Sequence, residues 1–267
     1  ISEPINVTKE NTIVLGLGYA TLKQTETNQC LAVGDVGGVI VADVMFDAGT
    51  QNGKLLMTVG NNKNVSHKDN PITLANLYFR VGGADTTACK VETCLTINSS
   101  DVICDNFWVW RADHGKEVGW DKNTSKTGVI VNGDNVTAYA LMVEHFQEYQ
   151  TIWNGENGKT FMYQCELPYD VPNQESWMNG DVQGYAGYYV AQQVNEHHAY
   201  GMGVYANFTK SCSYLNHAII VPDKPGVSIT NACSVVLSGK GGIDNVVNNA
   251  GAYALFSGDI SRVMSYC

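Results

Sequence analysis

The stretch that decides the fold is VNGDNVTAYALMVEHF, residues 131–146. It begins with an apolar residue and a short polar turn. Apolar and polar side chains then alternate until the run ends at Glu144 and His145. The stretches VGDVGGVIVADVMFDAG (33–49) and INSSDVICDNFWVWRADHG (97–115) follow the same plan. Alternation with a period of two is typical of a strand with one buried face. Its recurrence along the chain predicts a solenoid of β-strands.

Aligning the three stretches gives two sets of equivalent positions. They are Val33, Ile97 and Val131 at the start of each unit, and Val39, Ile103 and Thr137 after the turn. In a parallel β-helix such equivalent residues stack from coil to coil. The alternative is a β-sandwich, which needs hairpin turns between successive strands. Because the units recur as turn and strand without hairpins, we expect an all-β parallel β-helix. No linker divides the chain, so residues 1–267 are expected to form one domain.

Composition narrows the possible partners. The formal net charge is -10. The three arginines are Arg80, Arg111 and Arg262. Nucleic acid and anionic membranes attract clustered Lys and Arg, so neither is an expected partner. In addition, no apolar run approaches the roughly 18 residues of a spanning helix.

Cysteines and sequons predict an oxidising environment. The chain has eight cysteines and no C-x-x-C pair, which favours disulfides over zinc. Connectivity stays open, although Cys89 and Cys94 are close enough for a local loop. The glycosylation sequons are Asn6, Asn64, Asn98, Asn123, Asn135 and Asn207. Together these features indicate a secreted glycoprotein with disulfides. The alternative is a reduced protein with buried free cysteines.

Two glutamates end equivalent strand-like runs. Glu144 closes TAYALMVE, and Glu166 closes GKTFMYQCE about 22 residues later, a length that suits one coil. Alternation puts Ala138, Ala140, Met142 and Glu144 on one face, and Met162, Gln164 and Glu166 on another. Strands on neighbouring coils lie about 4.8 Å apart, so the carboxyls are expected about 5–9 Å apart. Paired glycosidase carboxyls have such separations, and their repulsion raises one pKa. The alternative is that both glutamates are solvated surface residues.

The surrounding residues suit a sugar. Aromatic faces pack on sugar rings, and polar side chains bind hydroxyls. The substrate-binding candidates are Trp110, Asp113, His114, His145, Trp153, Tyr163, Gln164, Tyr169 and Glu196, with Arg111 and Trp177 nearby. The histidines and carboxylates of RADHG (111–115) and NEHHAYG (195–201) lack H-x-x-x-H and H-E-x-x-H spacing. We therefore predict no metal and no cofactor.

Several stretches together resemble a known family. They are NTIVLGLGYAT, WVWRADHG, VGWD, the long run from GVIVNG to SWMNG, GYAGYYV and GMGVY. They are similar to the C-terminal half of secreted microbial proteins related to glycoside hydrolase family 55, the β-1,3-glucanases. The run from Val129 to Gly180 is the most specific part. The resemblance implies a right-handed, pectin-lyase-like β-helix, the second of two that lie side by side.

The resemblance also implies an activity and roles for residues. It implies inverting, exo-acting hydrolysis of β-1,3-glucan, with Glu166 as general acid and Glu144 positioning the attacking water. The family's first β-helix, which supplies part of the cleft, has no counterpart in this sequence. Expected partners are therefore a polysaccharide, and either that first half or further copies of the chain. The alternative function is a non-catalytic secreted β-helix that binds polysaccharide or self-assembles.

Overall fold

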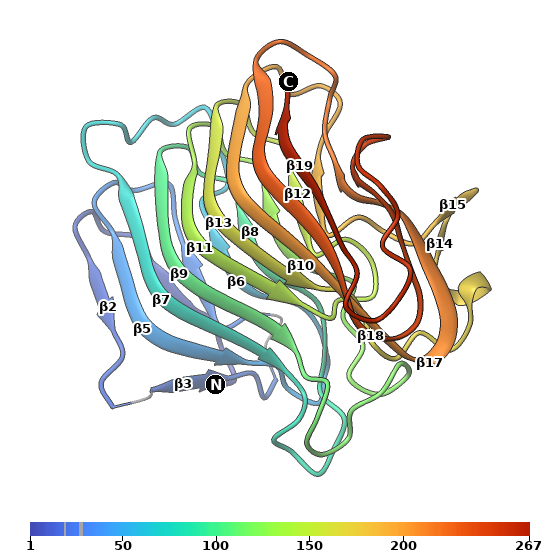
Figure 1. Cartoon of the computed structure of the whole chain (residues 1–267). Helices are drawn as coiled ribbons and strands as arrows, with labels where there is room; N and C mark the ends of the chain where they lie inside the picture. The colour runs from blue at the N-terminus through green and yellow to red at the C-terminus, as the bar shows by residue number, and fades with distance from the viewer. Residues whose placement is uncertain (19, 27–28) are drawn as a thin grey trace.

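The computed structural model describes residues 1–18, 20–26 and 29–267, and strands account for most of them (Figure 1). The only helical element in these residues is one 3-10 turn, η1. Accordingly, no helix in the described ranges has the length and apolar character to cross a membrane. The elements are β1 (Ile5–Val7), β2 (Ile13–Leu15), β3 (Thr21–Lys23), β4 (Leu31–Val33), β5 (Ile40–Asp47), β6 (Asn52–Val59), β7 (Ile72–Val81), β8 (Lys90–Ile97), β9 (Val102–Arg111), β10 (Thr127–Val131), β11 (Thr137–Glu144), β12 (Thr151–Trp153), β13 (Gly158–Glu166), η1 (Gln174–Ser176), β14 (Met178–Asn179), β15 (Val182–Gln183), β16 (Tyr188–Val190), β17 (His197–Ile220), β18 (Val227–Val247) and β19 (Ile260–Tyr266).

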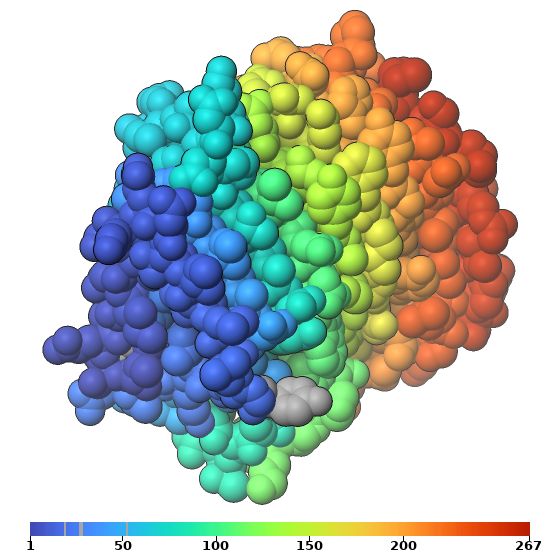
Figure 2. Space-filling view, turned by 90° about the vertical axis from the view of Figure 1, so that its left-hand side faces the viewer, coloured from blue at the N-terminus to red at the C-terminus, as the bar shows by residue number. Residues whose placement is uncertain are grey.

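The strands form two parallel series. One runs β4–β6–β8–β10–β12–β16, and the other runs β5–β7–β9–β11–β13–β17–β18. The chain alternates between them, so each strand pairs with its counterpart one coil later. Successive coils lie side by side in chain order (Figures 1 and 2). At the last coil, β19 pairs antiparallel with β18 and covers part of its edge. The expected right-handed parallel β-helix is confirmed.

The register tests the repeat alignment directly. Val33 pairs with Val59, Val59 with Ile97, and Ile97 with Val131, so the first set of equivalences is confirmed. Thr137 pairs with Ile103, as predicted.

The placement of Val39 in the alignment is wrong by one residue. Ile40 takes that place, because it pairs with Thr73, which pairs with Ile103. The turn before β5 is one residue longer and contains Gly38 at φ 68°. A side chain there would meet Asn11 and Asn70, so this turn requires glycine.

Every strand of the second series bends at an equivalent position, where one residue has positive φ. The bend residues are Asp43, Asn76, Asn106, Ala140, Met162, Gly201 and Asn231. On the early coils they form a ladder: the Asn76 amide donates to Asp43 (2.8 Å) and the Asn106 amide donates to Asn76 (2.8 Å). The left-handed residue also interrupts the period of two.

This interruption corrects the predicted faces. Ala138 and Leu141 both point inward, whereas Glu144 points outward, so Ala138 and Glu144 do not share a face. On β13 the order is the same, with Tyr163 and Cys165 inward and Gln164 and Glu166 outward.

Inward side chains stack into apolar columns through the coils. Phe46 stacks on Phe79 with ring centroids 4.9 Å apart, and Phe107 follows at 6.4 Å. These rings and the Val, Leu and Ile residues beside them are almost fully buried. The hydrophobic effect on these columns holds neighbouring coils in register, which fixes the relative positions of the outward side chains.

The prediction of disulfides is not confirmed, since all eight cysteines are free in this structure. Cys94, Cys104 and Cys165 face inward as small core residues. Burial raises the pKa of the Cys30 and Cys89 thiols to about 12, which keeps them protonated. The alternative of buried free cysteines describes five of the eight.

One sequon is not accessible. Asn123 is completely buried, and its amide donates to the carbonyls of Val81 (2.9 Å) and Ala112 (2.8 Å). A glycan on this nitrogen would break both bonds, so glycosylation at Asn123 is excluded. Asn6, Asn64 and Asn135 are exposed, and Asn98 and Asn207 are partly buried.

Candidate active site

Glu144 and Glu166 lie directly opposite each other at the ends of β11 and β13. They are Cα partners in a parallel register that runs the length of both strands. Their neighbours Val143 and Cys165 point into the core, so both glutamates point outward. Adjacent parallel strands lie about 4.8 Å apart. Two carboxylates on neighbouring coils therefore share one surface site.

The carboxylate of Glu144 is partly buried and held in place. The Trp108 indole N–H donates to Glu144 Oε2 at 2.8 Å, and Gln164 supplies a further hydrogen bond. Burial nevertheless raises the pKa of Glu144, an effect that the hydrogen bonds from Trp108 and Gln164 and the charge of His145 partly offset. Repulsion by Glu166 acts in the same direction as burial.

Glu166 is held by the histidine that follows Glu144. His145 Nε2 lies 3.2 Å from Glu166 Oε2, and His145 Nδ1 lies 3.2 Å from the Arg111 carbonyl oxygen. The His145 backbone has φ 70°, and its N–H donates to the Glu166 carbonyl at 2.7 Å. The left-handed turn thus points the imidazole sideways toward the next coil instead of continuing the strand.

A buried ion pair anchors this corner. Arg111 is fully buried and makes a bidentate contact with Asp170, at 3.0 and 2.8 Å. Its other N–H groups donate to the carbonyls of Asn123 (2.9 Å), His145 (3.1 Å) and Gly119 (3.0 Å). All five guanidinium donors are therefore used. This network joins the ends of β9, β11 and β13, and so fixes the backbone beneath the two glutamates.

Aromatic side chains line one edge of the pair. Trp108 and Trp110 stack at 5.0 Å, and the ring of the exposed His114 lies 5.1 Å from that of Trp110. Asp113 accepts a hydrogen bond from His114 or pairs with it (2.7 Å). Tyr169 packs edge-on against His145 at 5.4 Å. A hollow of about 540 Å³ begins here and is lined by Asp113, Trp120, Tyr169 and Lys210, among others.

The structure brings together most of the predicted site and separates the rest. Gathered around the glutamate pair are Trp110, Asp113, His114, His145, Gln164 and Tyr169. The prediction that Trp153 and Tyr163 bind substrate is wrong, because both side chains point inward and are buried. The nearby Trp177 and Arg111 are fully buried as well.

Glu196 is also misplaced by the sequence reading. It precedes β17, next to the first residues of β13, whereas Glu166 pairs with Tyr205 at the other end. The strand separates Glu196 from the pair.

Sequence reasoning missed Trp108 and Asp170. Trp108 lies two residues before Trp110 on the same outward face, so the period of two could have assigned it. Asp170 had no local signal, since its partner Arg111 comes from a strand two coils earlier.

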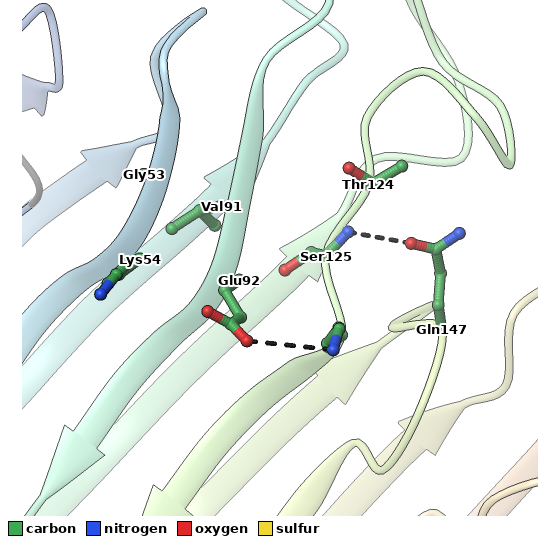
Figure 3. Close-up of a pocket in the computed structure, with 8 residues that line it drawn as sticks. Gly53, Lys54, Val91, Glu92, Thr124, Ser125 and Gln147 are labelled. Carbon is green, nitrogen blue, oxygen red and sulfur yellow. Dashed lines mark hydrogen bonds and ion pairs between the residues drawn. The ribbon is translucent and has the colours of Figure 1, made fainter. Parts of the chain in front are cut away.

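Another hollow on the molecule is lined by both acidic and basic residues (Figure 3). It measures about 400 Å³ and is lined by Lys54, Glu92, Ser125 and Lys126, among others. Lys126 lies 3.9 Å from Glu92 and 3.7 Å from Glu148, and all three side chains are exposed to solvent. Lysine neutralises these carboxylates, so this hollow is less suited to acid–base chemistry. Among the described residues, no group of three or more His, Cys, Asp or Glu is arranged to hold a metal ion.

Sequence comparison agrees with the fold and the repeats. The chain belongs to the family of LAM55 pectate lyase-like domains, whose model matches residues 1–166. It is 44% identical over 253 residues to an exo-beta-1,3-glucanase of Streptomyces sp. (strain SirexAA-E / ActE), a match that covers 94% of this chain and 42% of that protein.

Structural comparison gives the same result. The chain matches sacteLam55A from Streptomyces sp. SirexAA-E with a TM-score of 0.95 and 42% identity, over 99% of this chain and 48% of that one. It also matches a variant of sacteLam55A in complex with glucose, with a TM-score of 0.97 and 41% identity, over 100% of this chain and 48% of that one. The chain thus spans about half the length of the relatives that it matches.

Proposed function

We propose that the chain carries the acid–base pair of an inverting exo-β-1,3-glucan hydrolase. The observation that supports this most is the register of Glu144 with Glu166, which sets two outward carboxylates on neighbouring coils. The proposed activity is that of a relative, which is named exo-beta-1,3-glucanase. Inverting glycosidases use carboxyls about 6.5–9.5 Å apart, one as acid and one as base.

In this proposal Glu166 is the general acid and Glu144 the general base. Glu166 gives its proton to the glycosidic oxygen as the bond to the sugar breaks. Glu144 takes a proton from the water that adds to the opposite face of the sugar. Burial raises the pKa of Glu144, which makes its carboxylate a stronger base. Trp108 and Gln164 hold that carboxylate in one orientation.

The aromatic edge supports a sugar substrate. Trp108 and Trp110 are stacked beside Glu144, and Tyr169 borders the hollow on the side of His145. Glucan rings pack on such surfaces, and Asp113 and His114 are available to bind hydroxyls. The chain spans about half the relatives' length, so we further propose that it corresponds to the second of two β-helices, the first completing the cleft.

Extracellular action is part of the proposal. A glucan polymer is met outside the cell, and three sequons, Asn6, Asn64 and Asn135, are exposed on the surface. Expression in a secreting host followed by glycopeptide mass mapping tests this. Glycan addition at these three positions and none at Asn123 is the expected result.

The function is tested on laminarin. The expected result is release of glucose as the α-anomer, detected by NMR immediately after cleavage. Glu166→Gln should lower the rate by about 10²–10⁴-fold, the usual contribution of a general acid. Glu92→Gln is the matched control, because Glu92 lies with Lys126 outside the pair. Full activity in Glu166→Gln would overturn the assignment.

The second candidate function is glucan binding without cleavage. The stacked Trp108 and Trp110 favour it, because an aromatic edge can bind a sugar whether or not it is cut. Laminarin retained by the native chain with no glucose released would select this function. If the chain neither binds laminarin nor releases glucose, both functions are contradicted.

A further inference from the structure

We propose that His145 is a positioning residue that shares one proton with Glu166, so that the proton donated in the reaction belongs to the pair and not to Glu166 alone. This inference rests on the proposed role of Glu166 as the acid. It goes further by assigning a source for that proton.

The contact between His145 and Arg111 fixes the tautomer of His145. Its Nδ1 lies 3.2 Å from the Arg111 carbonyl oxygen, which can only accept a hydrogen bond. Nδ1 must therefore carry a hydrogen. In the neutral imidazole the remaining nitrogen, Nε2, then has a lone pair, and this is the nitrogen 3.2 Å from Glu166 Oε2.

The contact between His145 Nε2 and Glu166 Oε2 holds either one proton or none. With one proton, the contact is either a neutral imidazole that accepts from a carboxylic acid or an imidazolium that donates to a carboxylate. Both forms are satisfied hydrogen bonds. With no proton, the Nε2 lone pair would face a carboxylate, which is repulsive. The last proton therefore leaves the two residues as a unit.

Its surroundings hold the His145 side chain rigidly. Its backbone N–H donates to the Glu166 carbonyl, its carbonyl accepts from Arg111, and its ring packs edge-on against Tyr169. The side chain is almost completely buried. His145 is thus unable to turn away from Glu166 at low cost.

The charged and titratable groups around His145 are consistent with a shared proton. They are Arg111 on β9, Glu144 on β11, Glu166 on β13, and Tyr169 and Asp170 after β13. Arg111 and Asp170 neutralise each other. Burial raises the pKa of Tyr169 to about 12, so it stays neutral. Glu144 is then a further negative charge beside the pair, and it favours retention of the proton.

Proton balance in the reaction follows directly. The glycosidic oxygen takes the proton shared by His145 and Glu166 as its bond to the sugar breaks. The water that adds to the sugar gives a proton to Glu144. Solvent then returns a proton to His145 and Glu166, and takes one from Glu144.

The kinetic test uses two substitutions. In His145→Gln, the amide N–H can still donate to Glu166 but supplies no proton. The alkaline limb of the pH–rate profile should therefore move down by about 1–2 pH units, toward an ordinary glutamate. In His145→Asn, the backbone keeps a residue that tolerates positive φ, but the side chain is too short to reach Glu166. This variant should lose more of the plateau rate than His145→Gln. An unmoved alkaline limb in His145→Gln would overturn the proposal.

An NMR measurement tests the same inference without catalysis. Ring ¹⁵N shifts of the native chain should show His145 as the Nδ1–H tautomer at high pH. Glu166→Gln should change the ring ¹⁵N shifts of His145 near neutral pH, because the partner of Nε2 is lost, and those of the exposed His114 should stay the same. An Nε2–H tautomer in the native chain, or unchanged His145 ring shifts in Glu166→Gln, would overturn the proposal. Either result leaves the glucanase assignment itself intact, because that assignment depends on activity.

Discussion

One outward column of the β-helix carries two very different pairs of side chains. Asp47, Arg80, Trp110, Glu144 and Glu166 follow one another in register from β5 to β13. At the early end, Arg80 makes a bidentate contact with Asp47 (3.1 and 2.8 Å). At the late end, two acids are neighbours. Opposite charges stabilise such cross-strand pairs and like charges destabilise them. The late pair is therefore arranged for something other than stability.

The nearest arginine explains why the acids are not neutralised. Arg111 follows Trp110 on β9, but it points inward and all its donors are taken by Asp170 and by carbonyls. Arg80 neutralises Asp47 of the column, whereas Arg111 fixes the backbone beneath Glu144 and Glu166. A column built by one repeat is thus a structural ion pair at one end and a candidate active site at the other.

Removing the charge of the two arginines should separate these roles most strongly. Arg111→Met leaves Asp170 buried without a partner, which should cost about 3–5 kcal/mol of unfolding free energy. Arg80→Met is the comparison: it also leaves a buried acid, Asp47, without its bidentate partner, but Arg80 itself is 27% exposed, so the loss should be smaller than in Arg111→Met. Urea unfolding at neutral pH measures both. Equal losses in the two variants would contradict the view that Arg111 is the anchor.

The tryptophan beside Glu144 should control its acidity. Trp108→Phe keeps the ring but removes the hydrogen bond that lowers the pKa of Glu144. That pKa should rise further, so the acidic limb of the pH–rate profile on laminarin should move to higher pH. The loss of a hydrogen bond to a charged group, about 1.5 kcal/mol, corresponds to roughly a tenfold lower rate.

Trp110→Phe serves as the control for Trp108→Phe, because it keeps the hydrogen bond to Glu144 and should leave the acidic limb in place. If the acidic limb moves equally in both variants, the hydrogen bond is not its cause.

Relieving the like-charge pair should increase stability in a pH-dependent way. Because burial raises the pKa of Glu144 in the folded chain, the wild type loses stability as pH rises from the ordinary carboxyl range through that raised value. Glu144→Gln lacks this loss. It should be more stable than the wild type by up to about 1 kcal/mol at pH 7, and the gain should vanish near pH 4.

Urea unfolding at the two pH values tests the effect of Glu144→Gln. Glu92→Gln is the control, since Glu92 lies near Lys126 and should show no such gain. A Glu144→Gln variant with the same advantage at both pH values would rule out titration as the cause.

The sequence predicted the solenoid and the neighbouring glutamates because both depend on the repeat. A strand that recurs with the same turn must stack on its predecessor, and the one-coil spacing of Glu144 and Glu166 then sets their register. The one-residue error at Val39 arose because the turn before β5 is longer, and length differences between turns have no periodic signal.

The sequence did not predict features that depend on backbone conformation or on contacts between distant residues. The bend residue Ala140 has positive φ and reverses which later residues face inward, so alternation counted across it misassigned Ala138. Alternation counted back from Glu166 alone would have placed Tyr163 inside, as observed. The Arg111–Asp170 contact spans two coils, and no local pattern indicates which distant side chain a buried arginine will meet.

The smallest predicted effect concerns the column of bend residues, which changes character at the same coils as the charged column. Asp43, Asn76 and Asn106 are linked by amide hydrogen bonds, but the next bend residue is Ala140 at φ 50°. Alanine is strained in this conformation by about 1 kcal/mol, whereas asparagine tolerates it. Ala140→Asn should therefore extend the ladder from Asn106 and stabilise the chain by about 1 kcal/mol.

Thermal unfolding of Ala140→Asn beside Ala75→Asn is the measurement for the ladder. Ala75 precedes the bend on β7 and has no positive φ to relieve, so its substitution should bring no gain. If both substitutions stabilise the chain equally, the gain is a general surface effect and the ladder is not its cause. If only Ala140→Asn does, the late coils lack a stabilising ladder that their backbone accepts, as they lack the ion pair in the neighbouring column. In that case the column of bend residues and the charged column would both lack a stabilising contact on the strands that carry the glutamates. This is expected where function constrains the sequence.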